Sequence, residues 1–209
     1  MAGSMSQADL VAELKASLLD AAAVFTADDD ADFVRFLREA LPDVQAKRPR
    51  TKLGEVTLVA QQPTYALDAL TDFVALKVDM WRDPGKLPKP WELTYPGRLP
   101  RLEAVWDGEV WQLELEPAPS AAHLASLGSR CAFWYFAAHE IGVLAADTTV
   151  APADRGLLLL RAQAQAMLAM AVRNSGKPVQ LRDGLSGTPR NSTPAALHQT
   201  LMDLFWRAP

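Results

Sequence analysis

The chain has 209 residues, of which 49% are hydrophobic and 22% charged, with 21 Lys and Arg against 25 Asp and Glu. This composition is that of a globular protein with one sizeable domain or two small ones. The net charge of −4 argues against a general nucleic-acid binder, which carries a basic excess. The single cysteine, Cys131, excludes an intramolecular disulfide and a multi-cysteine zinc site.

Targeting signals are not evident in the sequence. No apolar run approaches the roughly 18 residues of a membrane-spanning helix. The first five residues lack the basic and apolar regions of a signal peptide, and either Met1 or Met5 could be the start. We therefore expect a soluble protein of a reducing compartment with no membrane partner.

Charge is distributed unevenly along the chain. Residues 1–128 hold 13 basic and 20 acidic side chains, whereas residues 129–209 hold 8 basic and 5 acidic ones. Two segments of opposite sign can pair with each other or with a neighbouring copy of the chain.

The N-terminal part predicts two helices. Apolar residues recur at helical spacing from Gln7 to Phe25, which predicts an amphipathic helix. Thr26 is the expected N-cap of a second helix, with the acidic run that follows it in the first turn and Pro42 as its end. A metal site at these carboxylates is the weaker interpretation, because they have no histidine or glycine turn nearby.

The middle of the chain predicts strands. After a basic loop at 47–52, alternation predicts strands at 55–59 and 73–81, and five prolines between Pro84 and Pro100 exclude a long helix. Asp107 and Gly108 separate two strand-like runs, 102–106 and 109–115, and predict a hairpin with a type I′ turn.

The remaining segments return to helical patterns. A short helix or turn is expected at 117–128, and residues 130–141 fit a strand or a helix, with the strand favoured by their aromatic content. The longest helix is expected from Pro152 to about Gly176, followed by a loop at 177–193. Thr193 and Pro194 predict the start of a final helix.

These elements predict an α+β fold. A helical bundle from both chain ends, residues 1–50 plus 150–209, would carry an inserted antiparallel β region at 51–149.

Residues with catalytic potential are sparse. His123, His139 and His198 have no metal-ligand spacing, and His139-Glu140 is half of a zinc-protease signature without its second histidine. Cys131 lies in an apolar aromatic run that predicts an inert core residue. We predict no catalytic, metal-binding or cofactor-binding residue and no cofactor, so the chain is not expected to be an enzyme.

Two groups of residues suggest binding. Arg182 and Arg190 in the glycine-containing loop could grip a carboxylate or a phosphate, although packing of this loop on a neighbour is the favoured interpretation. Five of the six tryptophans fall in the β region among acidic residues, which favours core and interface packing over base stacking. Trp206, beside Phe205 and Arg207, differs, because an aromatic and basic end is a plausible anchor for a partner's pocket.

Several segments resemble one family. Val56–Tyr65 resembles the "TLVAGQxxY" strand and turn of the head-to-tail connector (adaptor) proteins of tailed bacteriophages, with Gln61-Gln62 where a glycine turn is usual. Leu115–Ser120 is similar to that family's "LEPxPS" segment, and Tyr95–Pro100 precedes the hairpin as it does there. Residues 154–164 and 190–197 look like its later helices. The resemblance covers residues 50 to 200 through short motifs.

The resemblance implies a structural role. Such proteins form a ring, typically of twelve copies, at the neck of the virion, where they contact the portal protein and tail or stopper proteins around the DNA channel. They are in the host cytoplasm during assembly. Non-specific contact with channel DNA is implied as well. The residues expected at the portal or ring interface are Arg182, Arg190, Phe205, Trp206 and Arg207.

Two alternatives stay open at this point. One is a non-viral soluble interaction module that dimerises through its aromatic β region. The other, which we consider weaker, is a small intracellular enzyme that uses His139 and Glu140.

Overall fold

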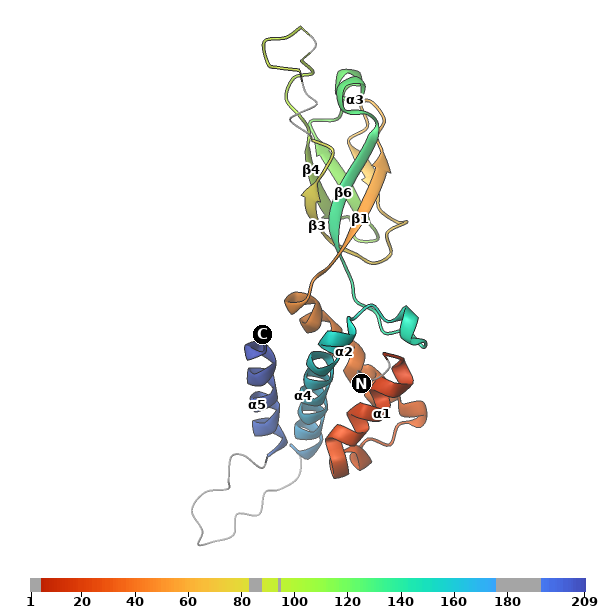
Figure 1. Cartoon of the computed structure of the whole chain (residues 1–209), viewed down its shortest axis with the longest axis vertical. Coiled ribbons are helices and arrows are strands. Elements are labelled where there is room, and N and C mark those ends of the chain that lie inside the picture. Colours follow the sequence, from red (N-terminus) through yellow and green to blue (C-terminus); the bar gives the residue numbers. More distant parts are fainter. Residues whose placement is uncertain (1–4, 83–87, 94, 176–192) are drawn as a thin grey trace. The chain divides into compact units, whose positions relative to one another are not determined.

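The structure, a computed structural model, describes residues 5–82, 88–93, 95–175 and 193–209 (Figure 1). It is a mixed α+β fold in which the N-terminal and C-terminal helices pack together and two small antiparallel sheets come between them in the sequence. The expected fold class is confirmed. The α-helices of the described residues are α1 Gln7–Leu18, α2 Ala31–Lys47, α3 Ala121–Leu127, α4 Arg155–Asn174 and α5 Pro194–Arg207. The strands are β1 Arg50–Thr57, β2 Thr64–Ala66, β3 Phe73–Asp79, β4 Arg101–Trp106, β5 Trp111–Glu116 and β6 Arg130–Ala137.

The chain divides into two compact units. One, here called the helical unit, consists of Met1–Arg48 and His139–Pro209, and the other, the β unit, is Pro49–Ala138. The division into folding domains at 1–50 plus 150–209 and at 51–149 stays a prediction.

The β unit begins and ends at neighbouring strand positions. β1 starts at Arg50 and β6 ends at Ala137, and these two residues are paired in antiparallel register. The Arg50 guanidinium also donates to the carbonyl of Ala138 at 3.3 Å. The two ends of the insertion are therefore held together by its own sheet.

The helical unit is built around one apolar core. Its members recur at three- and four-residue intervals on α1, α2 and α4, which gives each helix one buried stripe. Phe25, Phe33 and Phe36 form a cluster of edge-to-face rings with centroids 5.0 to 6.4 Å apart. The fully buried members are Leu10, Leu14, Phe36, Ala40, Val44, Leu158, Ala162, Ala166 and Phe205.

Ion pairs join the acidic N-terminal segment to the basic C-terminal one within this unit. Asp43 pairs with Arg161 at 2.5 Å, and Asp32 with Arg173 at 3.4 Å. Arg155 pairs with Glu13. Of the two outcomes expected from the uneven charge, pairing of the two segments with each other is the one that the structure shows.

The second helix differs from its prediction at both ends. Thr26 is not the N-cap, because α2 starts at Ala31 after a 3₁₀ turn in which Asp29 and Asp30 have φ of 52° and 60°. Pro42 does not end the helix, which continues to Lys47. Val44 is fully buried beyond the proline, and its burial offsets the lost backbone hydrogen bond.

The prediction of a basic loop at 47–52 is also wrong. Lys47 is still helical, and β1 already begins at Arg50, five residues before the predicted strand. Pairing with β6, which lies far along the sequence, extends this strand and has no local sequence signal.

The β unit consists of two three-stranded sheets with a shared core. Sheet A has the order β1-β6-β3 and sheet B the order β2-β5-β4. Residues 130–137 are a strand, as favoured from their aromatic content, in which Cys131, Phe133 and Tyr135 face inward. Gly54 lies opposite Phe133, and a Cβ there would come within 2.7 Å of the phenyl ring. The inner faces of both sheets contribute to one cluster, so their outer faces point in opposite directions.

The predicted hairpin exists, but its turn is different. Trp106 and Trp111 are the last paired residues of β4 and β5, so the loop has four residues instead of two. The carboxylate of Asp107 accepts hydrogen bonds from the backbone amides of Val110 and Glu109, both at 2.8 Å. These bonds lower the pKa of Asp107 and favour the four-residue loop over the type I′ turn.

A charged cluster lies where β1 and β6 leave the sheet. The carboxylate of Asp72 accepts from Lys52 Nζ at 2.7 Å and from the Tyr135 hydroxyl at 2.9 Å, with Arg50 at 3.4 Å. Burial raises the pKa of Asp72, but the hydrogen bonds from Lys52 and Tyr135 and the two positive charges outweigh it and leave the pKa below its usual value. Burial and the bond to Asp72 raise the pKa of Tyr135 to about 12.

The substitution Asp72→Asn tests this cluster. Because the carboxyl pKa is lower in the folded state, the charge stabilises the fold above the unfolded pKa, and this contribution is lost as pH falls through the folded pKa. We expect a loss of about 1.5–3 kcal/mol in unfolding free energy at neutral pH and a smaller difference from the wild type in acid. Denaturant unfolding at both pH values, with Asp68→Asn as an exposed control, measures this. An unchanged difference in acid would contradict it.

Gln61 gives a second test. It has a φ of 66° at the position where the connector family that the chain resembles has a glycine turn. A non-glycine residue in this conformation costs about 1 kcal/mol. Gln61→Gly is therefore expected to leave the unfolding free energy unchanged or to raise it by up to about 1 kcal/mol, whereas Ala60→Gly lowers it by about 0.5–1 kcal/mol. Equal losses in the two variants would refute the assignment.

Candidate functional site

The residues expected at an interface are partly described by the structure. Arg182 and Arg190 lie outside the described residues. Phe205, Trp206 and Arg207 form the last turn of α5.

The start of α5 follows its sequence signals. The Thr193 hydroxyl accepts from the amide of Ala196 at 3.2 Å, and Pro194 occupies the first helical position. The predicted final helix is confirmed.

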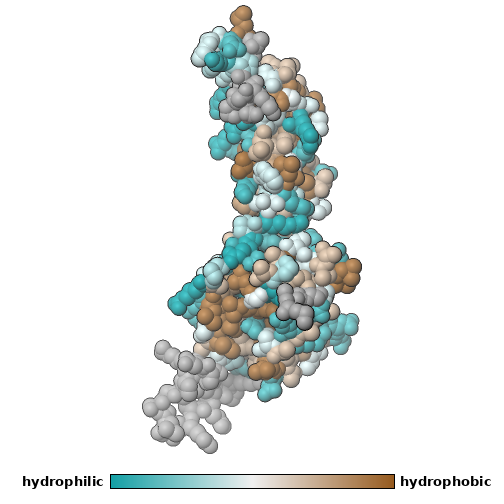
Figure 2. All heavy atoms as spheres, in the orientation of Figure 1, coloured by the Kyte–Doolittle hydropathy of each residue, from teal (hydrophilic) through white to brown (hydrophobic). Residues whose placement is uncertain are grey.

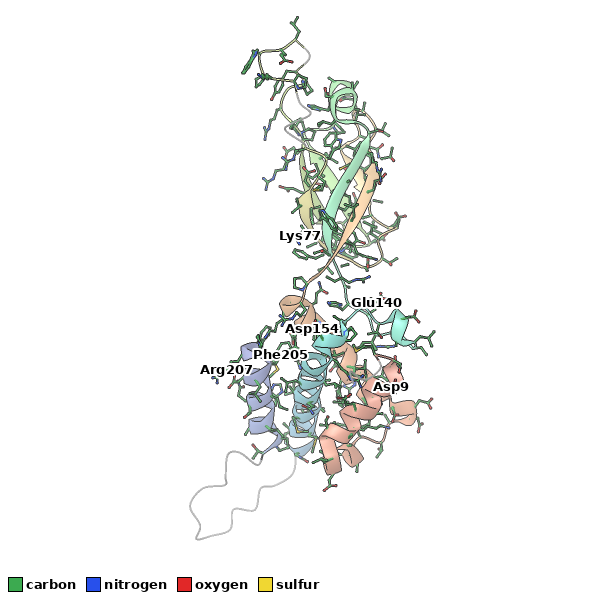
Figure 3. The ribbon with its side chains drawn as sticks, in the orientation of Figure 1. Asp9, Lys77, Glu140, Asp154, Phe205 and Arg207 are labelled. Atoms are coloured by element: carbon green, nitrogen blue, oxygen red, sulfur yellow. The ribbon has the colours of Figure 1, made fainter. Side chains whose placement is uncertain are left out.

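The three expected contact residues divide between the core and the surface. Phe205 is completely buried, so it belongs to the core of the helical unit. Trp206 is 51% exposed and packs edge-on against the Phe205 ring, with centroids 5.0 Å apart. Arg207 is exposed on the outer side of α5, and Phe205 lies on the side towards α4 (Figure 3). A partner can therefore reach Trp206 and Arg207 on the folded chain, while the buried Phe205 fixes this end of α5 in the core.

Lys47 holds the C-terminal end of α5. Its ammonium donates to the carbonyls of Phe205 at 2.7 Å and Ala208 at 2.5 Å, and it lies 5.3 Å from the centroid of the Phe205 ring. A cation at this end also complements the helix dipole. Next to it, Arg48 pairs with Asp154 at 3.0 Å. Sequence analysis missed this role, because the lysine lies 158 residues from its partner.

An incompletely covered apolar stripe runs along α5. Leu197 and Leu204 are 41% and 51% exposed, and Leu201 between them is half-buried. In Figure 2, hydrophobic side chains gather over α4 and α5 on this side of the helical unit. The spacing of four and then three residues was the signal that could have found this stripe.

The three histidines form structural hydrogen bonds. His139 Nε2 donates to the carbonyl of Arg48 at 2.8 Å, so Nδ1 is the acceptor for the Thr149 hydroxyl at 3.2 Å. His123 accepts from the Ser120 amide as part of a capping box, and His198 donates to the carbonyl of Ala164 on α4 at 2.8 Å. Both ring nitrogens of His139 form hydrogen bonds within the chain, so the position of this histidine has a structural explanation that does not involve zinc-protease-like chemistry.

The cysteine and the acidic side chains likewise offer no catalytic or metal-binding site among the described residues. Cys131 is fully buried, and burial, with a contribution from Asp79, raises the pKa of its thiol to about 12. Within the described residues, no group of three or more His, Cys, Asp or Glu side chains could hold a metal ion. None of the described helices is both long and apolar enough to span a membrane.

The structure brings together the two segments that carry the family resemblance most clearly. The backbone amide of Gln61 in the first segment donates to the carbonyl of Pro119 in the second at 2.7 Å. The backbone amide of Leu115 donates to the carbonyl of Pro63 at 2.8 Å. The Tyr65 hydroxyl closes the first turn through a bond to the Val59 amide at 2.8 Å. The two motifs therefore form one local structure.

Comparison with known proteins gives a structural likeness without a match in sequence. No family model and no curated protein matches the chain. A solved structure described as the neck of an empty GTA (gene transfer agent) particle computed with C6 symmetry is 18% identical, with a TM-score of 0.28, over 91% of this chain and 87% of that one.

The different burial of Phe205 and Trp206 makes a prediction about stability. Phe205→Ala leaves a cavity in the core and is expected to cost about 3–5 kcal/mol of unfolding free energy, whereas Trp206→Ala costs about 1 kcal/mol or less. Thermal and denaturant unfolding of the two variants measures this. Equal losses would show that Trp206 is as much a core residue as Phe205.

Proposed function

We propose that the chain is a head-to-tail connector (adaptor) of a tailed phage-like particle. It forms a ring, of twelve copies by analogy with the resembling family, between the portal and the tail at the neck of the particle. Its partners are the portal protein, tail or stopper proteins and further copies of itself, and DNA passes through the ring with non-specific contact.

The observation that supports this proposal most is the joining of the two family-like segments. Residues 56–65 and 115–120 are far apart in the sequence, yet two backbone hydrogen bonds connect them in one substructure. Short motifs that occur by chance have no reason to meet in space. The glycine-like φ of Gln61, at the one position where the first motif departs from the family, points the same way.

The C-terminal helix is the proposed portal contact. It offers Leu197 and Leu204 on one side of the helix and Trp206 on another as exposed apolar anchors, and Arg207 as a charge that partners can recognise. Lys47 and the buried Phe205 hold the helix end in place, so the anchors are ordered before binding, which lowers the entropic cost of docking. Arg182 and Arg190 remain part of the proposed interface.

The decisive experiment combines the purified chain with the portal protein of the same particle. Negative-stain imaging and native mass measurement should show a ring docked on the portal. The double variant Trp206→Ala with Arg207→Ala should lose docking while its unfolding temperature stays near that of the wild type. Gln199→Ala, an exposed change on the same helix, is the matched control.

Two results would refute the proposal. One is normal docking by the Trp206 and Arg207 double variant, which would remove the helix end from the interface. The other is a wild-type chain that is absent from particles and does not bind the portal, which would remove the connector role altogether. Truncation before Phe205 is unsuitable here, because it would remove a core residue.

A further inference from the structure

The outer face of sheet A carries a row of exposed apolar side chains. Leu53 on β1 and Val78 on β3 are both paired with Trp134 on the central strand β6, so the three lie side by side across the sheet. They are 55%, 46% and 38% exposed, respectively. Lys77 precedes Val78 on β3, and its ammonium lies 5.5 Å from the centroid of the Phe136 ring on β6. This surface, here called face A, also carries the Glu55–Arg130 ion pair, so it is apolar with a net basic margin.

The outer face of sheet B has the opposite character. Glu103 on β4 is paired directly with Glu114 on β5, and the neighbouring pair is Arg101 with Glu116. Val105, which is 38% exposed and is paired with Gln112, adds apolar surface on this side, whereas Trp106 and its partner Trp111 belong to the opposite side of the hairpin. This surface, here called face B, is acidic with an apolar margin.

The facing glutamates of face B are unfavourable within one chain. Like charges directly opposite each other on neighbouring strands are destabilising. Arg101 pairs with Glu103 at 3.0 Å, whereas Glu114 has no ion pair among the residues that the structure describes. A cation from outside the chain would relieve this repulsion, and face A presents one in Lys77.

We propose that face A of one copy packs on face B of the next copy. Because the two faces point in opposite directions and differ from each other, their contact is head-to-tail, and such a contact closes into a ring when the rotation permits. The charge complementarity of the two faces selects a second copy of this chain as the occupant. The inference deepens the proposed connector function, on which it rests for the ring.

The contact joins apolar to apolar and basic to acidic surface. The row of Leu53, Trp134 and Val78 would cover the exposed Val105 of the neighbour, and Lys77 would approach Glu103 and Glu114. An aromatic centre with a charged rim is the usual anatomy of a specific interface.

The test uses the full chain and two variants, each with one altered face. Trp134→Ser removes the centre of face A, and Glu114→Lys reverses the charge of face B. Sedimentation velocity of the wild type over rising concentration should show association beyond a dimer. Each variant alone should associate at least about tenfold more weakly. A mixture of the two should form a dimer and stop there, because each variant retains one intact face.

Controls separate loss of contact from loss of fold. Leu53→Ser, with its more exposed side chain, should reproduce the effect of Trp134→Ser with the unfolding temperature of the wild type. Val59→Ser, which removes an exposed apolar side chain outside both faces, should associate normally.

Several results would overturn the inference. They are a wild type that stays monomeric to about 1 mM, face variants that associate like the wild type, or a mixture that behaves as either variant alone. Portal docking is measured separately through α5. If docking occurs but the face variants have no effect on association, the inference fails and the connector function stands. If the copies associate through the two faces but the chain does not bind the portal, the connector function fails and the inferred contact between the faces stands.

Discussion

The antiparallel pairing of Arg50 with Ala137 is the constraint on which the rest of the structure depends. The core of the helical unit is made of residues before position 49 and after position 138. These can form one core only if the chain between them returns to the place where it left. The β unit meets this requirement through its own sheet, because its first and last strands are neighbours.

Electrostatics within the helical unit contributes to the same closure. Arg161 and Arg173 on α4 pair with carboxylates of the N-terminal segment, and Arg48 pairs with Asp154. The opposite charges of the two segments therefore serve, to this extent, the joining of the chain's own ends. In the β unit some acidic residues have no such partner, since the β4–β5 hairpin exposes Glu114 on the outer face of its sheet without an ion pair among the described residues.

Features that depend on neighbouring residues could be predicted from the sequence. The cap at Thr193, the proline at position 194 and the existence of the hairpin follow from local chemistry. Features that depend on distant partners could not. Val44 keeps α2 helical beyond Pro42, and the burial of Phe205 depends on packing against α4. The row on face A requires the register of three strands that are far apart in the sequence.

The inward position of Cys131 has a practical consequence. The only sulfhydryl group of the chain is sealed in the core between the two sheets and is protonated at any ordinary pH. A cysteine introduced at the surface would be the one group to react with a maleimide probe, so fluorophores or spin labels can be attached at chosen positions without first replacing the native residue. Distances between such labels would report how the two units are arranged in solution.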